Sequence, residues 1–372
     1  MEHKKSRKSS DQDKIKGVEL VSNNAETNRM IHYDLLRILA AFSVVMLHSA
    51  AQFWYTLDIY GADWLIANSY DAVFRFGVPI FVMISGALFL NPAYRLDTKR
   101  LYQHNILRIL IIYVVWSCVY GLRDCIVLGV TGAGWKVVVR EMISGRYHLW
   151  FLPMLTGLYI ILPVLKSWLE HAEKRNVEYF LGLFLVFQIG SETLRALTVT
   201  DELHGILDII QIELVCSYAG YFVLGYYLTY YQIDGKLRKG IYICTIPAIL
   251  CNILLGNYLA HRAGEPVGAI YDSFGVFTFV IVAALFLFFK EVVGQRSFGK
   301  RSSKWIREVS ADTLGIYVMH IGVIENFERI GIHSMMLPNL IGIPLYAAFC
   351  FGLCMVAAAI LRRIPVVGRY LC

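Results

Sequence analysis

Long runs of apolar residues, separated by short charged segments, form the main pattern along this chain. A helix needs about 20 such residues to cross the hydrocarbon core of a bilayer. Windows of that length predict ten membrane-spanning helices, at 31–53, 70–90, 105–128, 149–166, 177–194, 209–230, 240–260, 268–289, 312–332 and 338–361. The expected fold class is therefore all-α, a polytopic bundle of about ten transmembrane helices.

The composition supports this interpretation. Of the 372 residues, 57% are hydrophobic and 17% are charged. Soluble domains carry about 25% charged residues, so a soluble, core-rich enzyme is a weak alternative.

Lysine and arginine residues are distributed unevenly between the segments that connect the expected helices. With the N-terminus inside, the inner segments hold 25 of the 35 basic residues and the outer segments hold six. Because basic residues favour the cytosolic side, both termini are expected in the cytosol of a multi-pass plasma-membrane protein. The net charge of +7 follows from this topology and requires no nucleic-acid partner.

The chain is expected to have two parts. Residues 1–28 lack an apolar run and include Lys4, Lys5, Arg7 and Lys8. We expect them to form a disordered basic cytosolic tail, because no short apolar segment with a small-residue cleavage site is present. Residues 29–372 are expected to form a single transmembrane domain.

Motifs of several common catalytic sites are missing from the sequence. The eight cysteines show neither a CxxC pattern nor a Cys/His ligand spacing, so we expect no metal site. There is no GxxxxGK phosphate loop and no GxSxG nucleophile elbow. A nucleotide hydrolase or a lipase is disfavoured.

The first expected helix carries the most informative polar residues. Arg37 and His48 are eleven positions apart, so a helix places them on one face, about 16 Å apart along its axis. Asp34 lies one turn before Arg37, a spacing that suits an ion pair. Each ionisable side chain at mid-membrane costs roughly 2.5 to 3.5 kcal/mol, so this face indicates a functional site.

Polar residues in the next two helices have structural as well as functional explanations. Arg75 is expected at the outer edge of the second helix, and Ser85 with Gly86 follows within it. Small residues such as these often let two helices pack closely. Arg108 begins the third helix from the cytosolic side, where a long basic side chain can reach the headgroups.

Two further helices contain histidines. His148 and Trp150 begin the fourth helix at the outer interface, where a tryptophan is common in any case. Tyr317 and His320 lie one turn apart in the ninth helix. A histidine within a membrane helix either packs against a neighbouring helix through a hydrogen bond or serves a functional site.

Segment 33–48, Tyr-Asp-Leu-Leu-Arg-Ile-Leu-Ala-Ala-Phe-Ser-Val-Val-Met-Leu-His, resembles the opening motif of acyltransferase family 3. In that family of membrane O-acyltransferases, which includes acetyltransferases of bacterial cell-surface glycans, ten residues separate an arginine from a histidine. Segments 78–86, 148–152 and 314–320 continue the resemblance in the same order. The family usually has two arginines three apart at the third helix, and this chain has Asn105 and Arg108 there.

The resemblance implies an integral-membrane O-acyltransferase with ten helices. Such an enzyme moves an acetyl or other acyl group from acyl-coenzyme A to a hydroxyl of a cell-surface or lipid-linked glycan. Acetyl-coenzyme A is then the donor substrate, and no metal is needed. The expected partners are the lipid bilayer, the acyl-coenzyme A and the glycan acceptor, with a homodimer as one option for assembly.

The residue chemistry suits this reaction. A neutral imidazole is a suitable general base for a hydroxyl, so the expected catalytic residues are His48, Arg37 and Asp34. A transient acyl-imidazole at His48 is the alternative role. Arg37 can bind a coenzyme A phosphate or orient the thioester. Expected substrate-binding residues are Arg108, Ser85, Arg75, His148, Trp150, Tyr317 and His320.

A proton-coupled transporter of a glycan or small anionic metabolite is the alternative function. Buried arginine, histidine and aspartate side chains also relay protons and bind anions in transporters. The two halves of the sequence show no internal repeat, which argues against this class.

Overall fold

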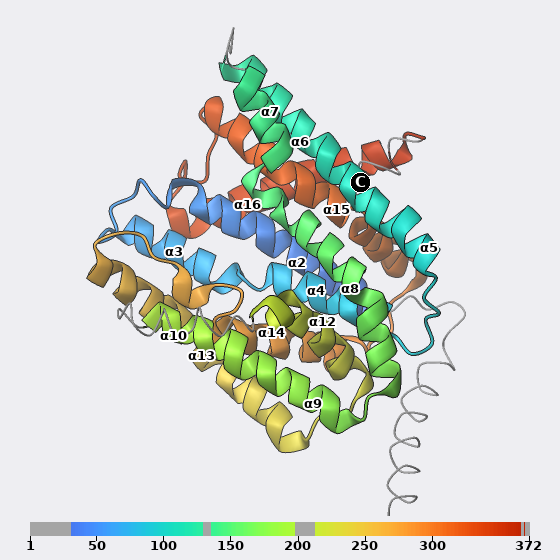
Figure 1. The fold of residues 1–372 in the computed structure, drawn as a ribbon. Coiled ribbons are helices and arrows are strands. Elements are labelled where there is room, and N and C mark those ends of the chain that lie inside the picture. Colours follow the sequence, from blue (N-terminus) through green and yellow to red (C-terminus); the bar gives the residue numbers. More distant parts are fainter. Residues whose placement is uncertain (1–30, 129–134, 198–212, 366–367, 369–372) are drawn as a thin grey trace, which may run out of the picture. The chain divides into compact units, whose positions relative to one another are not determined.

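The structure is a computed structural model that describes residues 31–128, 135–197, 213–365 and 368 (Figure 1). The regular elements within these ranges are all helical, which confirms the all-α class. The expected N-terminal tail lies outside the described residues.

Eight helical segments of the described chain are long and apolar enough to cross a membrane. They are Ile31–Phe53, Ala62–Phe89, Thr98–Val127, Met142–His171, Lys174–Leu197, Gly235–Ala263, Ala269–Val293 and Asn339–Arg363. Each overlaps one expected span. The other two expected spans overlap α12 (Glu213–Tyr230) and α15 (Lys300–Arg329). The count of ten and the cytosolic termini stay predictions.

The helices form two compact units, and each contains segments that are distant in the sequence. The first unit contains the chain up to Arg95 together with Leu165–Arg307. The second unit contains Leu96–Val164 together with Glu308–Cys372. Packing is described within each unit.

The first unit contains most of the helices. They are α2 (Ile31–Ala50), α3 (Ala62–Phe74), α4 (Gly77–Phe89), α9 (Lys174–Leu183), α10 (Ser191–Leu197), α12, α13 (Gly235–Ala263) and α14 (Val276–Phe288), with short 3-10 or π turns at Ala51–Phe53, Phe184–Gly190, Ala269–Tyr271 and Phe289–Val293. Asp234 caps α13, since its side chain accepts hydrogen bonds from the amides of Lys236 and Leu237. A helix start has such unpaired amides, and the cap satisfies two of them.

Glycine residues allow α4 and α12 to pack closely. A Cβ atom on Gly86 would lie 1.8 Å from the carbonyl oxygen of Phe222, and one on Gly225 would lie 2.0 Å from that of Met83. The two contacts run in opposite directions along the chain, so the helices are antiparallel. The prediction that small residues here permit close helix packing is confirmed for Gly86.

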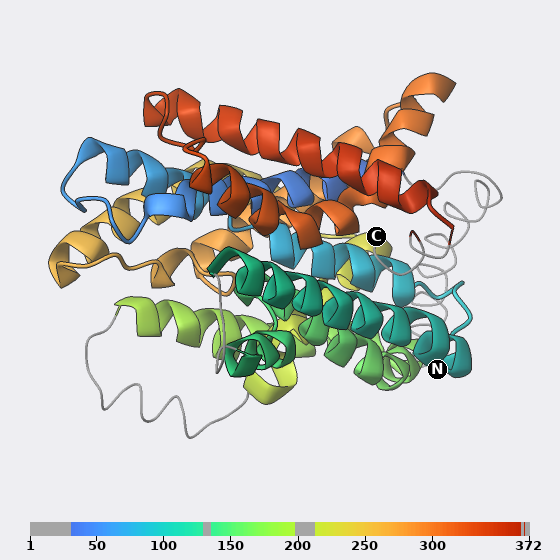
Figure 2. The ribbon, with the colours of Figure 1, turned by 90° about the horizontal axis from the view of Figure 1, so that it is seen from above.

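Helix α2 packs against α3 and α4 within the first unit (Figures 1 and 2). Gly77 opens α4, and a Cβ atom there would lie 2.4 Å from Ser43 Oγ and 2.8 Å from the carbonyl oxygen of Ala40. This approach falls between Arg37 and His48 along α2. The start of α4 therefore fixes the middle of the helix that carries both predicted catalytic residues.

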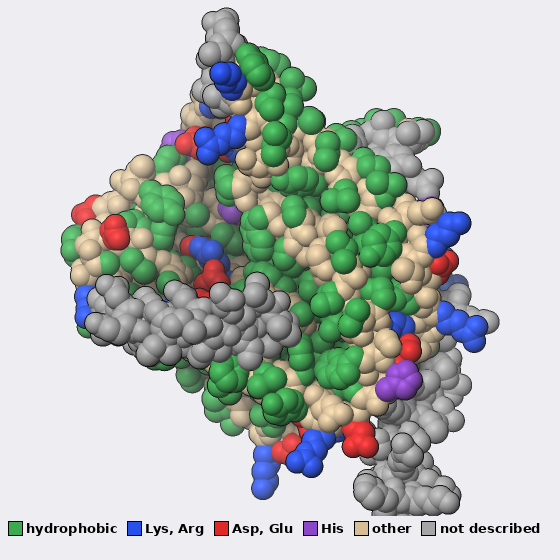
Figure 3. Space-filling model, viewed as in Figure 1, with side chains coloured by type: hydrophobic (Ala, Val, Ile, Leu, Met, Phe, Trp, Pro, Cys, Tyr) green, Lys and Arg blue, Asp and Glu red, His purple; other side chains and the backbone are tan. Residues whose placement is uncertain are grey.

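The second unit is built on three long helices. Its elements are α5 (Thr98–Arg100), a π turn at Leu101–Ile106, α6 (Leu107–Leu128), α7 (Trp135–Ser144), a 3-10 turn at Tyr147–Trp150, the first part of α8 (Phe151–His171), most of α15, and α16 (Asn339–Arg363). Helices α15 and α16 run antiparallel, since Tyr346 contacts Ile324 and Arg362 contacts Asp312 (Figure 2). Figure 3 shows hydrophobic side chains over the visible faces of α6 and α8, as a lipid-facing surface requires.

Candidate functional site

Helix α2 carries the ion pair that the sequence predicts. Arg37 Nη1 lies 3.4 Å from Asp34 Oδ1, one turn earlier on the helix. The Asp34 side chain is 2% exposed and that of Arg37 is 23% exposed. The carboxylate lies in the first turn, where the helix dipole favours a negative charge. The buried Asp34 thus holds the guanidinium of Arg37 in place. The predicted ion pair is confirmed.

His48 lies in the last turn of the same helix and is half-buried. Since α2 is unbroken from residue 31 to 50, Arg37 and His48 share one face, about 16 Å apart along the axis. The negative end of the helix dipole favours a cation in the last turn. This position suits an imidazole that takes up a proton during a reaction.

The position expected for Arg75 was wrong. The helical segment begins at Ala62, eight residues before the expected start, so Arg75 lies midway along it, where α3 ends and before α4 begins. Two hydrogen bonds, of 2.8 and 2.6 Å, join its guanidinium to the buried Asp71. The guanidinium also lies 5.5 Å from the ring centre of Tyr271. The charge of Arg75 is therefore balanced inside the protein.

A buried amide, Asn68, lies in the part of α3 that precedes the expected span. Its oxygen accepts hydrogen bonds from Trp54 Nε1, at 3.0 Å, and from the Tyr271 hydroxyl. Its nitrogen donates to Asn257 Oδ1 on α13, also at 3.0 Å. The Asn68 side chain thus faces protein and not lipid, which a hydropathy window cannot detect.

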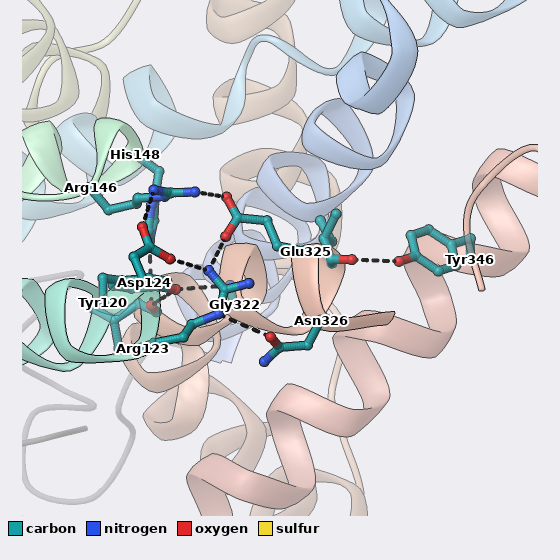
Figure 4. Close-up of polar contacts among 11 residues, drawn as sticks. Tyr120, Arg123, Asp124, Arg146, His148, Gly322, Glu325, Asn326 and Tyr346 are labelled. Atoms are coloured by element: carbon teal, nitrogen blue, oxygen red, sulfur yellow. Dashed lines mark hydrogen bonds and ion pairs between the residues drawn. The ribbon is translucent and has the colours of Figure 1, made fainter. Parts of the chain in front are cut away.

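In the second unit, four charged side chains form a closed network at the end of α6 (Figure 4). Arg123 contacts Asp124 at 3.1 Å, and Arg146 contacts Asp124 at 2.9 Å. Both arginines also pair with Glu325 of α15. We call Arg123, Asp124, Arg146 and Glu325 the charge quartet. Its net charge is zero, and it ties the segment just before His148 to α15.

The histidines predicted from the later motifs come together in the second unit. The rings of His148 and His320 are 5.1 Å apart and nearly perpendicular. The Tyr317 hydroxyl donates a hydrogen bond to the backbone carbonyl of His148. His320 Nδ1 lies 2.6 Å from the carbonyl oxygen of Tyr317. The segments around 148 and 317–320 therefore form one buried cluster.

Tyr120 of α6 contacts two backbone groups of α15. Its hydroxyl donates to the carbonyl of Val318 at 2.8 Å and accepts from the amide of Gly322 at 3.0 Å. In an α-helix that amide and that carbonyl, four residues earlier, are partners of each other, so Tyr120 binds at one turn of the helix. A Cβ atom on residue 322 would lie 3.3 Å from the Tyr120 hydroxyl, so glycine leaves room for the Tyr120 ring.

The comparison that decides the family covers nearly all of the described chain. A sequence profile for an acyltransferase domain matches residues 31–362, from the start of α2 to the last turn of α16. The chain belongs to acyltransferase family 3. Comparisons with curated proteins and with solved structures give no match. Membership makes the protein a membrane acyltransferase, as the motif at 33–48 indicates.

The structure places the remaining predicted site residues of this acyltransferase as follows. Arg108 lies exposed on α6 in the second unit, whereas Arg37 belongs to the first unit. The Ser85 hydroxyl donates to the carbonyl of Phe81 in its own helix, at 2.9 Å. The Trp150 side chain is exposed beside the buried His148. Their roles in substrate binding stay predictions.

Sequence reasoning missed several partners that complete these sites. Asp71 lies four positions before Arg75, and that spacing alone could have suggested their ion pair. No comparable local signal connects Tyr120 with Val318 or Arg123 with Glu325, since about 200 residues separate each pair. Within the described ranges, no group of three or more His, Cys, Asp or Glu residues has a metal-binding arrangement.

Proposed function

We propose that this acyltransferase moves an acetyl group from acetyl-coenzyme A to a hydroxyl of a cell-surface or lipid-linked glycan. The face of α2 that carries Asp34, Arg37 and His48 supports the proposal. It combines a histidine with an arginine that an ion pair holds in place. The histidine suits proton transfer, and the arginine suits binding of an anionic donor.

In the proposed reaction, His48 acts as the general base. The acceptor oxygen attacks the acyl carbon while its proton passes to the imidazole of His48. The carbon–sulfur bond then breaks, and the coenzyme A thiolate takes that proton from the imidazolium. The last turn of α2 favours the imidazolium that forms between the two steps.

Arg37 is proposed to bind the donor. Its guanidinium keeps its charge when buried and offers several hydrogen bonds to a phosphate or a thioester oxygen. Asp34 is buried beside it and positions the guanidinium without neutralising all of its donors. In the proposed topology Arg37 lies toward the cytosol, the source of acyl-coenzyme A, and His48 lies about 16 Å further out.

The proposed acceptor and location follow from the same topology. A donor that enters from the cytosol and an acceptor hydroxyl that reaches His48 from the outer side would meet at the outer end of α2. The proposal places the protein in the plasma membrane with both termini in the cytosol, as the basic residues indicate.

Labelled acetyl-coenzyme A tests the proposal. Purified protein in lipid nanodiscs should release the thiol and transfer label to octyl glucoside, a lipid-like probe with free hydroxyls. His48→Ala should lower transfer by about 10² to 10⁴ without lowering the unfolding temperature. His171→Ala is the matched control, because that histidine is exposed and bonds to the Ser167 carbonyl.

Two outcomes would contradict different parts of the proposal. Full activity in a folded His48→Ala protein would remove His48 as the base. The absence of any thiol release by the wild-type protein would exclude acetyl-coenzyme A as the donor. A label that stays on the wild-type protein without an acceptor, and is lost in His48→Ala, would favour the acyl-imidazole route.

Arg37 has a separate test, which is direct binding of coenzyme A. Arg37→Gln should weaken binding by about tenfold or more, since a lost charge-assisted contact costs about 1.5 to 3 kcal/mol. Arg37→Lys should restore it only in part, because the planar fork is lost. Unchanged affinity in both variants would place the donor elsewhere.

A further inference from the structure

The backbone carbonyl of Val318 receives two side-chain donors from outside its own helix. The Tyr120 hydroxyl donates at 2.8 Å, and His148 Nε2 lies at 3.3 Å (Figure 4). A carbonyl oxygen has two lone pairs, so it can serve both. The Gly322 amide, the usual helical partner of this carbonyl, also donates to the Tyr120 oxygen. Tyr120 is therefore held beside the carbonyl that His148 contacts.

This contact determines which nitrogen of His148 carries the proton. A carbonyl can only accept, so Nε2 must be the protonated donor. In a neutral imidazole the other nitrogen, Nδ1, then has a free lone pair. Nδ1 is buried and has no hydrogen-bond partner among the described residues. A buried polar atom of this kind is uncommon in folded proteins and calls for a ligand or water.

The surroundings of His148 restrict what can bind there. The ring is packed between Tyr120 and His320, at 5.3 and 5.1 Å, and both contacts are perpendicular. The neighbours Tyr147 and Trp150 in the same 3-10 turn are exposed, so the turn lies at the surface of the unit. A bare nitrogen accepts a hydrogen bond and cannot donate one. It therefore binds hydroxyl or amide groups and gives nothing to a phosphate or carboxylate.

We propose that His148 Nδ1 accepts a hydrogen bond from a hydroxyl of the acyl acceptor other than the one that is acylated, with Val318 and Tyr120 as positioning residues that fix its orientation. This inference rests on the proposed function, because it assigns the acceptor side of that same reaction. The Nδ1 atom distinguishes the acceptor from the phosphates of coenzyme A, because the phosphates have no proton to donate to it.

Two substitutions separate the two nitrogens of His148. Glutamine has an amide nitrogen near the position of Nε2, so His148→Gln keeps a donor for Val318 and loses the Nδ1 acceptor. Asparagine has an amide oxygen near the position of Nδ1, so His148→Asn keeps the acceptor and loses the Val318 contact. His171→Gln, at the exposed end of the following helix α8, is the matched control.

The assay measures KM for octyl glucoside and for acetyl-coenzyme A, together with the unfolding temperature. His148→Gln should raise KM for octyl glucoside about tenfold or more, with an unchanged KM for the donor and an unchanged unfolding temperature. His148→Asn should keep a lower KM for octyl glucoside than His148→Gln but unfold at a lower temperature. Tyr120→Phe should raise the same KM, since it removes the hydroxyl that holds the Val318 carbonyl beside His148.

Wild-type kinetics in His148→Gln would overturn the inference and leave the proposed function intact. A raised KM for the donor alone would do the same. If the wild-type protein does not use acetyl-coenzyme A, the proposed function fails. In every case, 15N spectra of labelled histidines report the tautomer, with His148 identified by the signal that His148→Gln removes. An unprotonated Nδ1 whose signal shifts with octyl glucoside supports the inference, and a protonated Nδ1 overturns it.

Discussion

Removing one charge from the charge quartet should destabilise the second unit more than removing a surface charge. In Arg146→Gln, Asp124 and Glu325 lose one of their two cations and only Arg123 remains between them. In Glu325→Gln, the two arginines retain only Asp124. Either change leaves one unit of net charge in a partly buried site. The double variant restores a neutral site that contains the Arg123–Asp124 pair.

The exposure of the four side chains sets the expected magnitude. Breaking a fully buried ion pair costs about 3 to 5 kcal/mol, and a surface pair contributes about 0 to 1 kcal/mol. The quartet is 13% to 22% exposed, so it is closer to the buried case. We expect each single substitution to lower the free energy of unfolding by about 2 kcal/mol. The double variant should lose at least about 1 kcal/mol less than the sum of the two.

Unfolding by SDS in mixed micelles measures these differences. Arg238→Gln is the matched control, because its partner Glu291 lies at 3.5 Å and the arginine is 43% exposed. That control should lose less than about 1 kcal/mol. Strictly additive losses in the quartet variants, or losses no larger than that of Arg238→Gln, would refute the view that the four charges act as one network.

Three further predictions concern close packing and buried amides, each measured by the same SDS titration. Gly86→Ala should cost about 1 to 3 kcal/mol, because its Cβ meets the backbone of Phe222, whereas Gly182→Ala, with nothing within 4 Å, should cost nothing. Asn68→Ala should cost about 1 to 3 kcal/mol, since it leaves buried donors unpaired. Gly77→Ala should also lower transfer from acetyl-coenzyme A, because it displaces the middle of α2; full activity would contradict this.

The sequence predicts well the features that one helix contains. Arg37 and His48 share a face because helical periodicity alone determines it, and Asp34 pairs with Arg37 through a spacing of three residues. The same reasoning places Tyr317 and His320 one turn apart on α15. Local spacing was sufficient in each of these cases, since no other helix had to be known.

The sequence predicts less well the features that depend on a second helix. A hydropathy window scores each residue by its cost in lipid, so it excluded the polar start of α3 from the membrane helix. Asn68 is buried there and bonds to α13 and to the turn at Ala269–Tyr271. These two partners lie about 190 to 200 residues away in sequence, and nothing local indicates the pairing.

The second unit contains buried polar groups of two kinds, paired charges and a nitrogen without a partner. In the charge quartet, the carboxylate oxygens of Glu325 are paired with the two arginines. This pairing offsets the free-energy cost of burying the charges and stabilises the helix contact. His148 has one nitrogen bonded to Val318 and one with a free lone pair. Burying a polar atom without a partner costs free energy, so a protein that keeps an unpaired Nδ1 has a functional reason to do so. The unpaired nitrogen is therefore stronger evidence for a substrate contact than any of the paired charges around it.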